Sequence, residues 1–360
     1  MYIHKSVTKS FIALVLLAFV STLSNAQSLR KLSNALFQSE EWYGSTESVN
    51  VAENVLILQK ENGGWPKNFR KYKNKLSQTE KDEILKTKND IEEATIDNGA
   101  TYSEMVFLAR MYKATKNEKY KRAFIDGLNF IFSIQYPNGG FKQFSRSKGY
   151  YTHITYNDNA TFNVLSLLRS IAARDDLFTG ISDNNTIDNC KKSFDKGIDC
   201  IIKSQYIQNG KKTIWCAQHD EFTLKPAKAR AYELPSLSGQ ESVGLVILLM
   251  DIENPDSTVI NAVNAAMEWF ENNRIRDYRL ERYINPDGKP DLKMVKSNNG
   301  PDLWGRFCDL NTNRAFVCDR DGIVKYDISE IGYERRTGYG WYTSEPERLF
   351  KRYKSWKEKH

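Results

Sequence analysis

The chain has 360 residues, a formal net charge of +7 and 40% hydrophobic residues, which is the composition of an ordinary globular protein. The mild positive charge is spread along the chain, and no basic run with interleaved aromatics indicates a nucleic-acid-binding protein. The five cysteines are odd in number and none has a Cys-x-x-Cys spacing, so we expect buried thiols rather than a disulfide framework. With only His153 and His219 in the chain interior, the sequence argues against a His-rich zinc site.

The first segment in chain order has the features of a secretory signal peptide. Two lysines precede an apolar run from Phe11 to Val20, and small residues follow it up to Ala26. The run is too short to span a bilayer, and no cysteine follows the cut to take a lipid. We therefore predict a signal peptide over 1–26 and a secreted or periplasmic mature protein over 27–360, with no membrane span.

Three stretches of the chain resemble one another. They are LQKENGGWPKN from Leu58, IQYPNGGFKQF from Ile134 and SQYIQNGKKTIW from Ser204. Each has a glutamine, a turn rich in Gly and Asn, and then an aromatic residue. Internal repetition at this scale indicates stacked supersecondary units. The aromatics at equivalent positions, Trp65, Phe141 and Trp215, are expected to fill gaps between those units.

The segments between these stretches have helical periodicity. A helical hairpin is predicted from Ala100, with its turn at Lys116 and Asn117, and further hairpins start at Ala160 and Ser242. Convincing alternating strand patterns are scarce. The sequence therefore predicts an all-α fold, an (α/α) toroid of repeated helical hairpins with its loops forming a site at one end.

The loops that enter these hairpins carry polar residues at matching places. They read TIDNGAT over 95–101, TYNDNAT over 155–161 and SGQES over 238–242. One interpretation makes their Asp, Asn and Ser residues helix N-caps, whose side chains bond the free amides of the first turn. The other makes them ligands, and acidic residues in matching loops favour a shared site that contains Asp97 and Asp158.

Two regions add positive charge. The stretch KPAKARAYELPSLSGQES, over 225–242, sets Lys225, Lys228 and Arg230 close to Tyr232, just before a helix. From about Pro286 the periodicity weakens, and we expect irregular loops with one or two short strands that cover one end of the toroid, closed by a short helix over 345–357. This part contributes Arg306, Arg314 and Arg320.

Aspartates alone would suggest a glycoside hydrolase, which needs two carboxyl groups beside the scissile bond. The added cations suit an anionic polysaccharide, because a guanidinium binds a carboxylate through two parallel hydrogen bonds. A polymer of uronic acid can be cut by β-elimination, in which a base removes the C5 proton next to the carboxylate. A hard cation such as Ca²⁺, held by aspartates, would neutralise that carboxylate.

The ordered motifs of the chain resemble those of the family-10 pectate lyases. The match runs from about Asn50 to Tyr353 and rests on eight motifs: NGGWPKN, TIDNGAT, HITYNDNAT, QHD, KPAKARAYELPSLSGQES, LWGRFCDLNTNR, DRDG and ERRTGYGWY. Eight motifs in the same order are far more specific than any one of them.

This resemblance implies a single catalytic domain, a monomer that cleaves α-1,4-linked polygalacturonate with Ca²⁺ as cofactor. It implies a role for each of these residues: Arg230 as the base, Asp97 and Asp158 as calcium ligands, and Lys225, Arg306, Arg320, Asn98 and Tyr232 as substrate-binding residues.

The identity of the base and two other functions stay open at this point. Arginine is normally protonated, so a base role requires desolvation and nearby cations that favour its neutral form. Lys225 or His219 is the alternative base. A glycoside hydrolase using Asp97, Asp158 or Glu241 explains the acidic residues but leaves the arginines without a role. A non-catalytic pectin-binding protein would bind the polymer without turnover.

Overall fold

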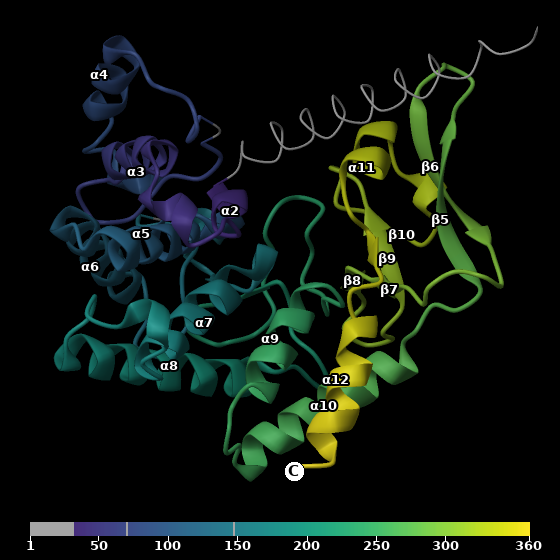
Figure 1. Cartoon of the computed structure of the whole chain (residues 1–360). Coiled ribbons are helices and arrows are strands. Elements are labelled where there is room, and N and C mark those ends of the chain that lie inside the picture. The colour runs from purple at the N-terminus through teal and green to yellow at the C-terminus, as the bar shows by residue number, and fades with distance from the viewer. Residues whose placement is uncertain (1–31, 70, 147) are drawn as a thin grey trace, which may run out of the picture. The chain divides into compact units, whose positions relative to one another are not determined.

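The computed structural model describes residues 32–69, 71–146 and 148–360, and the predicted signal peptide lies outside them. The described chain is mostly helical and forms two compact units (Figure 1). Unit 1 contains the described residues up to Ala94 together with Ala100–Phe130 and Asp176–Ile181. Unit 2 contains Thr95–Gly99, Ile131–Asp175 and Ser182–His360. The prediction of one catalytic domain stays a prediction.

Unit 1 is built on helices that pack through apolar faces. Its helices are α2 (Leu32–Ala35), α3 (Thr46–Leu58), α4 (Gln78–Lys86), α5 (Tyr102–Thr115) and the part of α6 (Glu118–Ser133) up to Phe130. The helix α5 packs against α2 and α3. Lys116 ends α5 in a left-handed conformation (φ 54°), so the turn expected there is confirmed.

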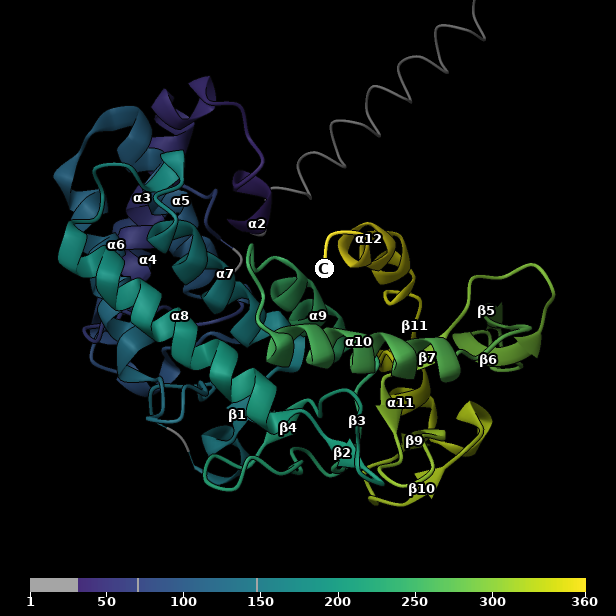
Figure 2. The ribbon, with the colours of Figure 1, turned by 90° about the horizontal axis from the view of Figure 1, so that it is seen from below.

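Unit 2 holds the second and third predicted hairpins. Its helices are α7 (Ala160–Ala172), α8 (Asn184–Ser204), α9 (Glu241–Met250), α10 (Ser257–Asn272), α11 (Tyr333–Gly338) and α12 (Glu347–Lys357). The helix α7 packs on α8 and α9, while α9, α10 and α12 pack together (Figure 2). Asp183 and Asp256 cap the amino ends of α8 and α10. Both hairpins and the short C-terminal helix are confirmed.

The three related stretches make the same hydrogen bonds. In each, the glutamine Nε2 donates to a carbonyl in its own turn and to a carbonyl on the second helix of the following hairpin. The pairs of acceptors are Gly63 and Ala123 for Gln59, Gly139 and Ser193 for Gln135, and Thr213 and Ala262 for Gln205. The repeated sequence therefore encodes a repeated anchor between a loop and its hairpin.

The aromatic residues of the repeats are structural, as expected. Trp65, Phe141 and Trp215 have no exposed surface. The Nε1 atoms of Trp65 and Trp215 each donate, at 2.7 Å, to a carbonyl in the helix before their loop, that of Val55 and Ile201 respectively. Each ring thus fills a gap beside its helix while its one polar atom is satisfied.

The strands all lie in small antiparallel sheets. The pairs are β1 (Ile154–Thr155) with β4 (Gln218–His219), β2 (Ile207–Gln208) with β3 (Lys211–Lys212), β5 (Tyr278–Ile284) with β6 (Pro290–Lys296), and β7 (Trp304–Gly305) with β11 (Tyr342–Thr343). The one three-stranded sheet in the described chain orders β10 (Val324–Lys325), β9 (Ala315–Cys318) and β8 (Phe307–Cys308).

The hairpin of β5 and β6 differs from the expectation of irregular loops from about Pro286. Its turn is shaped by Asn285, whose Oδ1 accepts the backbone N–H groups of Asp287 and Lys289, and by Gly288 at φ 75°. Turn chemistry of this kind favours a hairpin. The sequence does not show the alternation of apolar and polar residues that is typical of a strand, because neither face of β5 is fully buried and few apolar residues are needed on either face.

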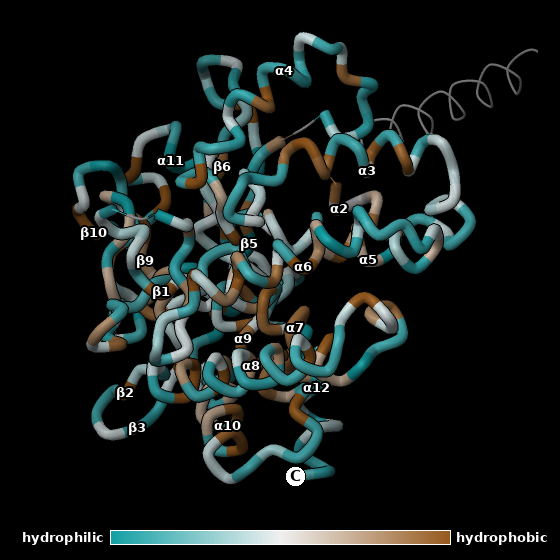
Figure 3. The backbone as a smooth tube through the Cα atoms, turned by 90° about the vertical axis from the view of Figure 1, so that its left-hand side faces the viewer, coloured by the Kyte–Doolittle hydropathy of each residue, from teal (hydrophilic) through white to brown (hydrophobic). Residues whose placement is uncertain are grey.

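A hydrophobic cluster in unit 2 joins these strands to the loop before α9. Its members are Tyr232, Phe307, Phe316, Val317, Cys318, Ile328, Ile331 and Trp341. Leu292 and Met294 of β6 pack against it. In Figure 3 the tube is hydrophobic over much of α7 and α9 and mainly hydrophilic at the β2–β3 turn. The cluster gives the arginine-rich loops a rigid support.

All five cysteines are buried and unpaired, as expected. Burial raises the pKa of the Cys308 thiol to about 12, so this thiol stays neutral and behaves as a small apolar group. Within the described residues, no helix combines the length and the apolar character needed to cross a membrane.

One buried carboxyl group in unit 1 has a consequence for stability. Glu104 of α5 is 3% exposed, and its Oε1 accepts a hydrogen bond of 2.6 Å from the Tyr72 hydroxyl. Burial raises its pKa from 4.5 to about 7, although the Tyr72 hydrogen bond opposes the shift. The folded state therefore holds a proton that the unfolded chain releases at lower pH.

We predict that the stability from protonated Glu104 is fully present below about pH 4.5 and is lost as pH rises through about 7. Glu104→Gln keeps an uncharged carbonyl acceptor for Tyr72. The free energy of unfolding of this variant, relative to that of the native chain, should increase from pH 5 to pH 8 by at most about 3 kcal/mol. Urea unfolding at both pH values measures this difference. A difference that does not change with pH would contradict the assignment.

Candidate active site

Two turns with the same backbone conformation carry the predicted acidic ligands. They are η3 (Asp97–Gly99) and η5 (Asn157–Asn159), which pack against each other in unit 2. Asn98 (φ 53°) and Asp158 (φ 50°) occupy the same left-handed position of the two turns. The N-caps of α5 and α7 are Thr101 and Asn159, and neither caps through its side chain. Neither Asp97 nor Asp158 is therefore the N-cap residue of its helix.

A buried arginine lies beside the second turn. Arg306 follows β7, is 8% exposed, and forms an ion pair of 2.8 Å with Glu241 Oε1 at the start of α9. Its Nη2 also donates to Asn157 Oδ1 at 3.1 Å and to Asp158 Oδ1 at 3.4 Å. Arg306 therefore binds η5 and α9 together.

The electrostatics of this group follow from burial. Burial raises the pKa of Glu241 to about 7, against the attraction of Arg306, and the charge of Asp158 adds to the rise. For Arg306, burial alone would lower the pKa, but the carboxylates of Glu241 and Asp158 raise it overall. The guanidinium thus stays charged between two carboxyl groups.

The ring of Tyr339 connects Arg306 to the arginine-rich loop. The Arg306 guanidinium lies 4.8 Å from the ring centroid, and the Tyr339 hydroxyl donates to Glu233 Oε1 at 2.8 Å. Glu233 is buried. Its Oε2 accepts the backbone N–H of Arg230 at 3.1 Å and lies 3.3 Å from the side-chain Nε of that residue.

Arg230, the candidate base, is held in its charged form. Its Nη1 donates to the Tyr232 hydroxyl at 2.9 Å, and half of its side chain is exposed. Partial burial would lower the pKa of Arg230, but the Glu233 carboxylate and the Tyr232 hydroxyl raise it overall. In this arrangement Arg230 holds its proton more tightly than a free arginine does.

Three guanidinium groups surround the buried ring of Tyr232. Their Cζ atoms lie 4.6 Å (Arg335), 5.8 Å (Arg230) and 5.9 Å (Arg320) from its centroid. Glu334 pairs with both Arg320 and Arg335. Arg335, Glu233 and Tyr339 are absent from the set of candidate residues that the sequence provided, although two of them lie in the motif ERRTGYGWY and one in ARAYE.

The remaining sequence candidates behave differently. Lys225 is exposed, and within the described chain its Nζ forms no ion pair or hydrogen bond. His219 was the other alternative base, and that interpretation is wrong. Its Nδ1 contacts the Leu224 carbonyl at 2.8 Å and its Nε2 accepts the Cys216 N–H at 3.1 Å. Burial lowers its pKa to about 4, so it is a neutral structural residue.

A separate group of possible metal ligands lies near β1 and β4. One ligand atom each of His153, Asp220 and Glu221 fall within 4.8 Å of one another. His153 Nδ1 is 3.0 Å from Glu221 Oε2, and Asp220 Oδ1 accepts the backbone N–H groups of Phe222 and Thr223. These contacts account for the cluster as a loop-fixing hydrogen-bond network.

We predict that Arg306→Met destabilises the protein by about 3 kcal/mol, because it leaves Glu241 buried without its partner. The double variant Arg306→Met/Glu241→Met should recover much of this loss, since the buried charge is then absent. Arg320→Met is the matched control, because its pair with Glu334 is exposed and such pairs contribute at most about 1 kcal/mol. Urea unfolding measures all three, and equal losses for Arg306→Met and Arg320→Met would contradict the prediction.

Comparison with known proteins identifies the family. The family model "Pectic acid lyase" matches residues 59–350. No curated protein matches the chain. Two solved structures of the family 10 polysaccharide lyase from Cellvibrio cellulosa are similar to it. The first is 37% identical with a TM-score of 0.73, over 90% of this chain and 94% of that one.

The second is a variant of that lyase with one aspartate changed to alanine, in complex with trigalacturonic acid. It is 36% identical with a TM-score of 0.72, over 88% of this chain and 96% of that one. The family model includes every motif that carried the resemblance, and the two structures match 88% and 90% of this chain. The chain belongs to the pectic acid lyase family, that is, to the family 10 polysaccharide lyases.

Proposed function

We propose that this protein is an exported, calcium-dependent pectate lyase that cleaves α-1,4-linked polygalacturonate by β-elimination, with Arg230 as the base for the C5 proton. Two findings support the substrate. A relative was solved with trigalacturonic acid, and three guanidinium groups gather on Tyr232. The observation that carries the proposal is this arginine cluster, linked through Tyr339 to the carboxyl groups around Arg306.

The acidic turns suit a calcium ion that substrate helps to coordinate. Asp97 and Asp158 offer carboxylate oxygens from two packed turns, and Asn98, next to Asp97, is kept as a proposed substrate contact. Ca²⁺ takes six to eight oxygen ligands, more than these side chains supply, so water and uronate carboxylates would complete the set. When bound there, the ion would supply charge neutralisation of the uronate carboxylate.

The protein's own residues would perform binding and proton removal. Arg320, whose side chain is exposed, is the group for a uronate carboxylate, since guanidinium binds carboxylate bidentately. Arg335 is buried and held by Glu334, so it positions the Tyr232 ring. Lys225 and Tyr232 remain proposed substrate contacts. Arg306 holds η5 in position rather than reaching solvent, since it is buried. The C5 proton passes to the neutral side chain of Arg230, and the C5–H electron pair forms the C4–C5 double bond. The C4–O4 bond breaks, and the O4 oxygen leaves with that electron pair and takes a proton from water.

Arg230 must lose its interaction with Glu233 before it can accept a proton. The carboxylate raises the pKa of Arg230, which opposes formation of the neutral guanidine. We propose that substrate binding separates the Arg230 side chain from Glu233. Glu233 keeps the Tyr339 hydroxyl and a backbone N–H as donors after that separation.

Two alternative functions have less support. A glycoside hydrolase would need two available carboxyl groups, but Glu241 is fully buried and paired with Arg306. A non-catalytic binding protein would not require a candidate base beside the arginine cluster. The toroidal stacking, the single domain, the monomeric state and the signal peptide over 1–26 are kept as proposals; the matching Gln59, Gln135 and Gln205 anchors support the first.

We predict that the protein releases 4,5-unsaturated products from polygalacturonate, detected as rising ultraviolet absorbance, and that excess chelator stops the reaction. Arg230→Met should lower kcat by about 10² to 10⁴, because a positioned proton acceptor contributes that much. Arg348→Met, which changes an exposed arginine on α12, is the control and should match the native enzyme. New reducing ends without the absorbance change would indicate a hydrolase instead.

We also predict that Glu233→Gln shifts the pH–rate profile. Since the Glu233 carboxylate raises the pKa of Arg230, its removal lowers that pKa and makes the neutral base available at lower pH. The rising acidic limb of kcat/KM, which reports the free enzyme, should therefore move to lower pH, and initial rates at low substrate concentration across a pH series will measure it. An unmoved limb, or one displaced upward, would argue that Arg230 is not the titrating base.

A further inference from the structure

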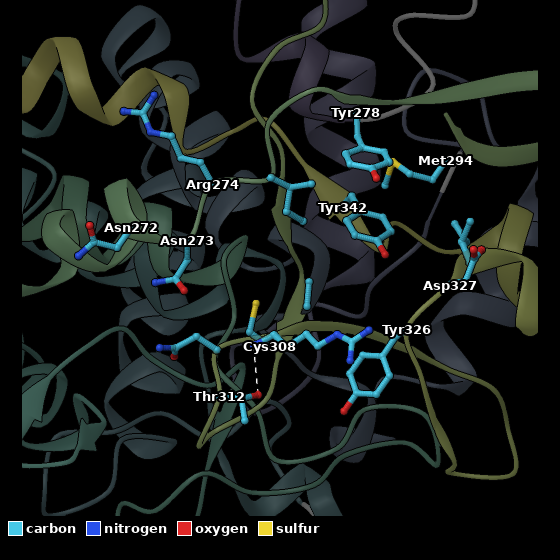
Figure 4. Close-up of a pocket in the computed structure, with 15 residues that line it drawn as sticks. Asn272, Asn273, Arg274, Tyr278, Met294, Cys308, Thr312, Tyr326, Asp327 and Tyr342 are labelled. Carbon is cyan, nitrogen blue, oxygen red and sulfur yellow. Dashed lines mark hydrogen bonds between the residues drawn. The ribbon is translucent and has the colours of Figure 1, made fainter. Parts of the chain in front are cut away.

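Unit 2 contains a concave site that includes none of the candidate catalytic residues. It is a pocket of about 530 Å³ between the end of α10, the β5–β6 hairpin and the loops around β9. Figure 4 shows Tyr278, Met294 and Tyr342 together on one side of it, and Asn272, Asn273 and Arg274 on the opposite side. A pocket with aromatic walls and a few polar groups has the general character of a small-ligand site.

The hydrophobic cluster of unit 2 separates this pocket from the arginine cluster. Ile328 belongs to the cluster and also lines the pocket, and Met294 and Tyr342 pack against the same cluster. Tyr232 is a member of the cluster, but it contacts Arg230, Arg320 and Arg335 and does not line the pocket. The two sites therefore share a core and do not share ligand-facing residues.

One arginine of the pocket is oriented by an aromatic ring. The Arg314 guanidinium lies 3.6 Å from the centroid of the Tyr326 ring, and both residues are exposed. Its backbone N–H is fixed by Thr312 Oγ1 at 3.4 Å, the contact dashed in Figure 4. Among the described residues its side chain has no carboxylate partner, so its planar N–H groups are available for an external carboxylate.

The other charged residues of the pocket are already engaged. Arg274 forms ion pairs with Asp302 at 2.7 Å and with Glu271, and it lies 4.1 Å from the Phe350 ring. Asp327 accepts the backbone N–H of Ser329 and caps a short helical turn. Arg314 is thus the charged group that is left to recognise a ligand, and it selects an anion.

The remaining walls suit a sugar ring. Tyr326 is 44% exposed, and Tyr278 and Tyr342 are partly exposed, so flat faces are accessible for the apolar face of a pyranose. Asn272 and Asn273, at the end of α10, offer amide groups to hydroxyls. One carboxylate, one apolar face and several hydroxyls are together the chemical description of a uronic acid.

We propose that this pocket is a non-catalytic binding site for a galacturonate unit of a pectic chain, with Arg314 and Tyr326 as its main contacts. The choice of galacturonate rests on the proposed function, whereas the preference for an anionic sugar rests on the pocket itself. A second contact of this kind would hold a polymer on the enzyme while another segment of the chain reaches the catalytic site, which raises apparent affinity without a new catalytic group.

Affinity electrophoresis in native gels that contain polygalacturonate tests this inference. Chelator is present so that no turnover occurs. The proteins are the native chain, Arg314→Gln, Tyr326→Ala and the control Arg348→Gln, which removes an exposed arginine on α12. We expect each pocket variant to bind the polymer about five to ten times more weakly, as befits the loss of a charged hydrogen bond or of its aromatic support, and the control to bind as the native chain does.

The outcomes separate the pocket from the lyase proposal. Pocket variants that keep the native melting temperature and the native retardation would overturn the inference. If the variants lost as much affinity for dextran, a neutral polysaccharide, as for polygalacturonate, the inference would also be overturned, since Arg314 would then not be binding a carboxylate. Retardation that depends on Arg314 in a protein that forms no unsaturated product would leave the pocket in place and refute the lyase. Product formation with retardation independent of Arg314 would do the reverse.

Discussion

The buried guanidinium of Arg306 is the constraint on which the rest of the site depends. A charge with 8% exposure is tolerated only if fixed partners replace the water it has lost. Those partners are the Glu241 carboxyl group and the polar groups of η5. They come from separate parts of the chain, so this one side chain brings the start of α9, the turn that carries Asp158 and the strand region of β7 and β8 into register.

The aromatic ring of Tyr339 extends this constraint to the loop before α9. Its face lies on the Arg306 guanidinium and its hydroxyl bonds Glu233, which in turn orients Arg230. Arg335 contacts both Tyr339 and Tyr232. Charged groups that would repel one another are therefore spaced by aromatic faces, which attract guanidinium cations without neutralising them. Such an arrangement leaves positive charge available for an acidic polymer.

The sequence predicted what depends on short-range patterns. The helical hairpins follow from three-to-four spacing, and the Gln59, Gln135 and Gln205 anchors follow from a repeated string of residues. Motif resemblance supplied Asp97, Asp158 and Arg230. The β5–β6 hairpin was missed because its faces are both partly exposed. The role of Tyr339 was missed because it touches Glu233 and Arg306 only after the chain has folded, and local pattern gives no sign of such a contact.

The same contacts explain how an arginine can be both firmly protonated and a candidate base. Without substrate, the Glu233 carboxylate stabilises the charged form of Arg230, and a charged Arg230 attracts a polyanion. In the proposed mechanism, a neutral Arg230 is needed only once the sugar is bound. Because Glu233 also accepts hydrogen bonds from the Tyr339 hydroxyl and from the backbone N–H of Arg230, the Arg230 side chain can leave it without stranding a buried carboxylate. The free-energy cost of forming the proposed neutral base is thus limited by the Tyr339 hydroxyl, which keeps its hydrogen bond to Glu233. Because the Tyr339 ring also contacts the Arg306 guanidinium, the buried charge of Arg306 is connected to the proposed proton removal by Arg230.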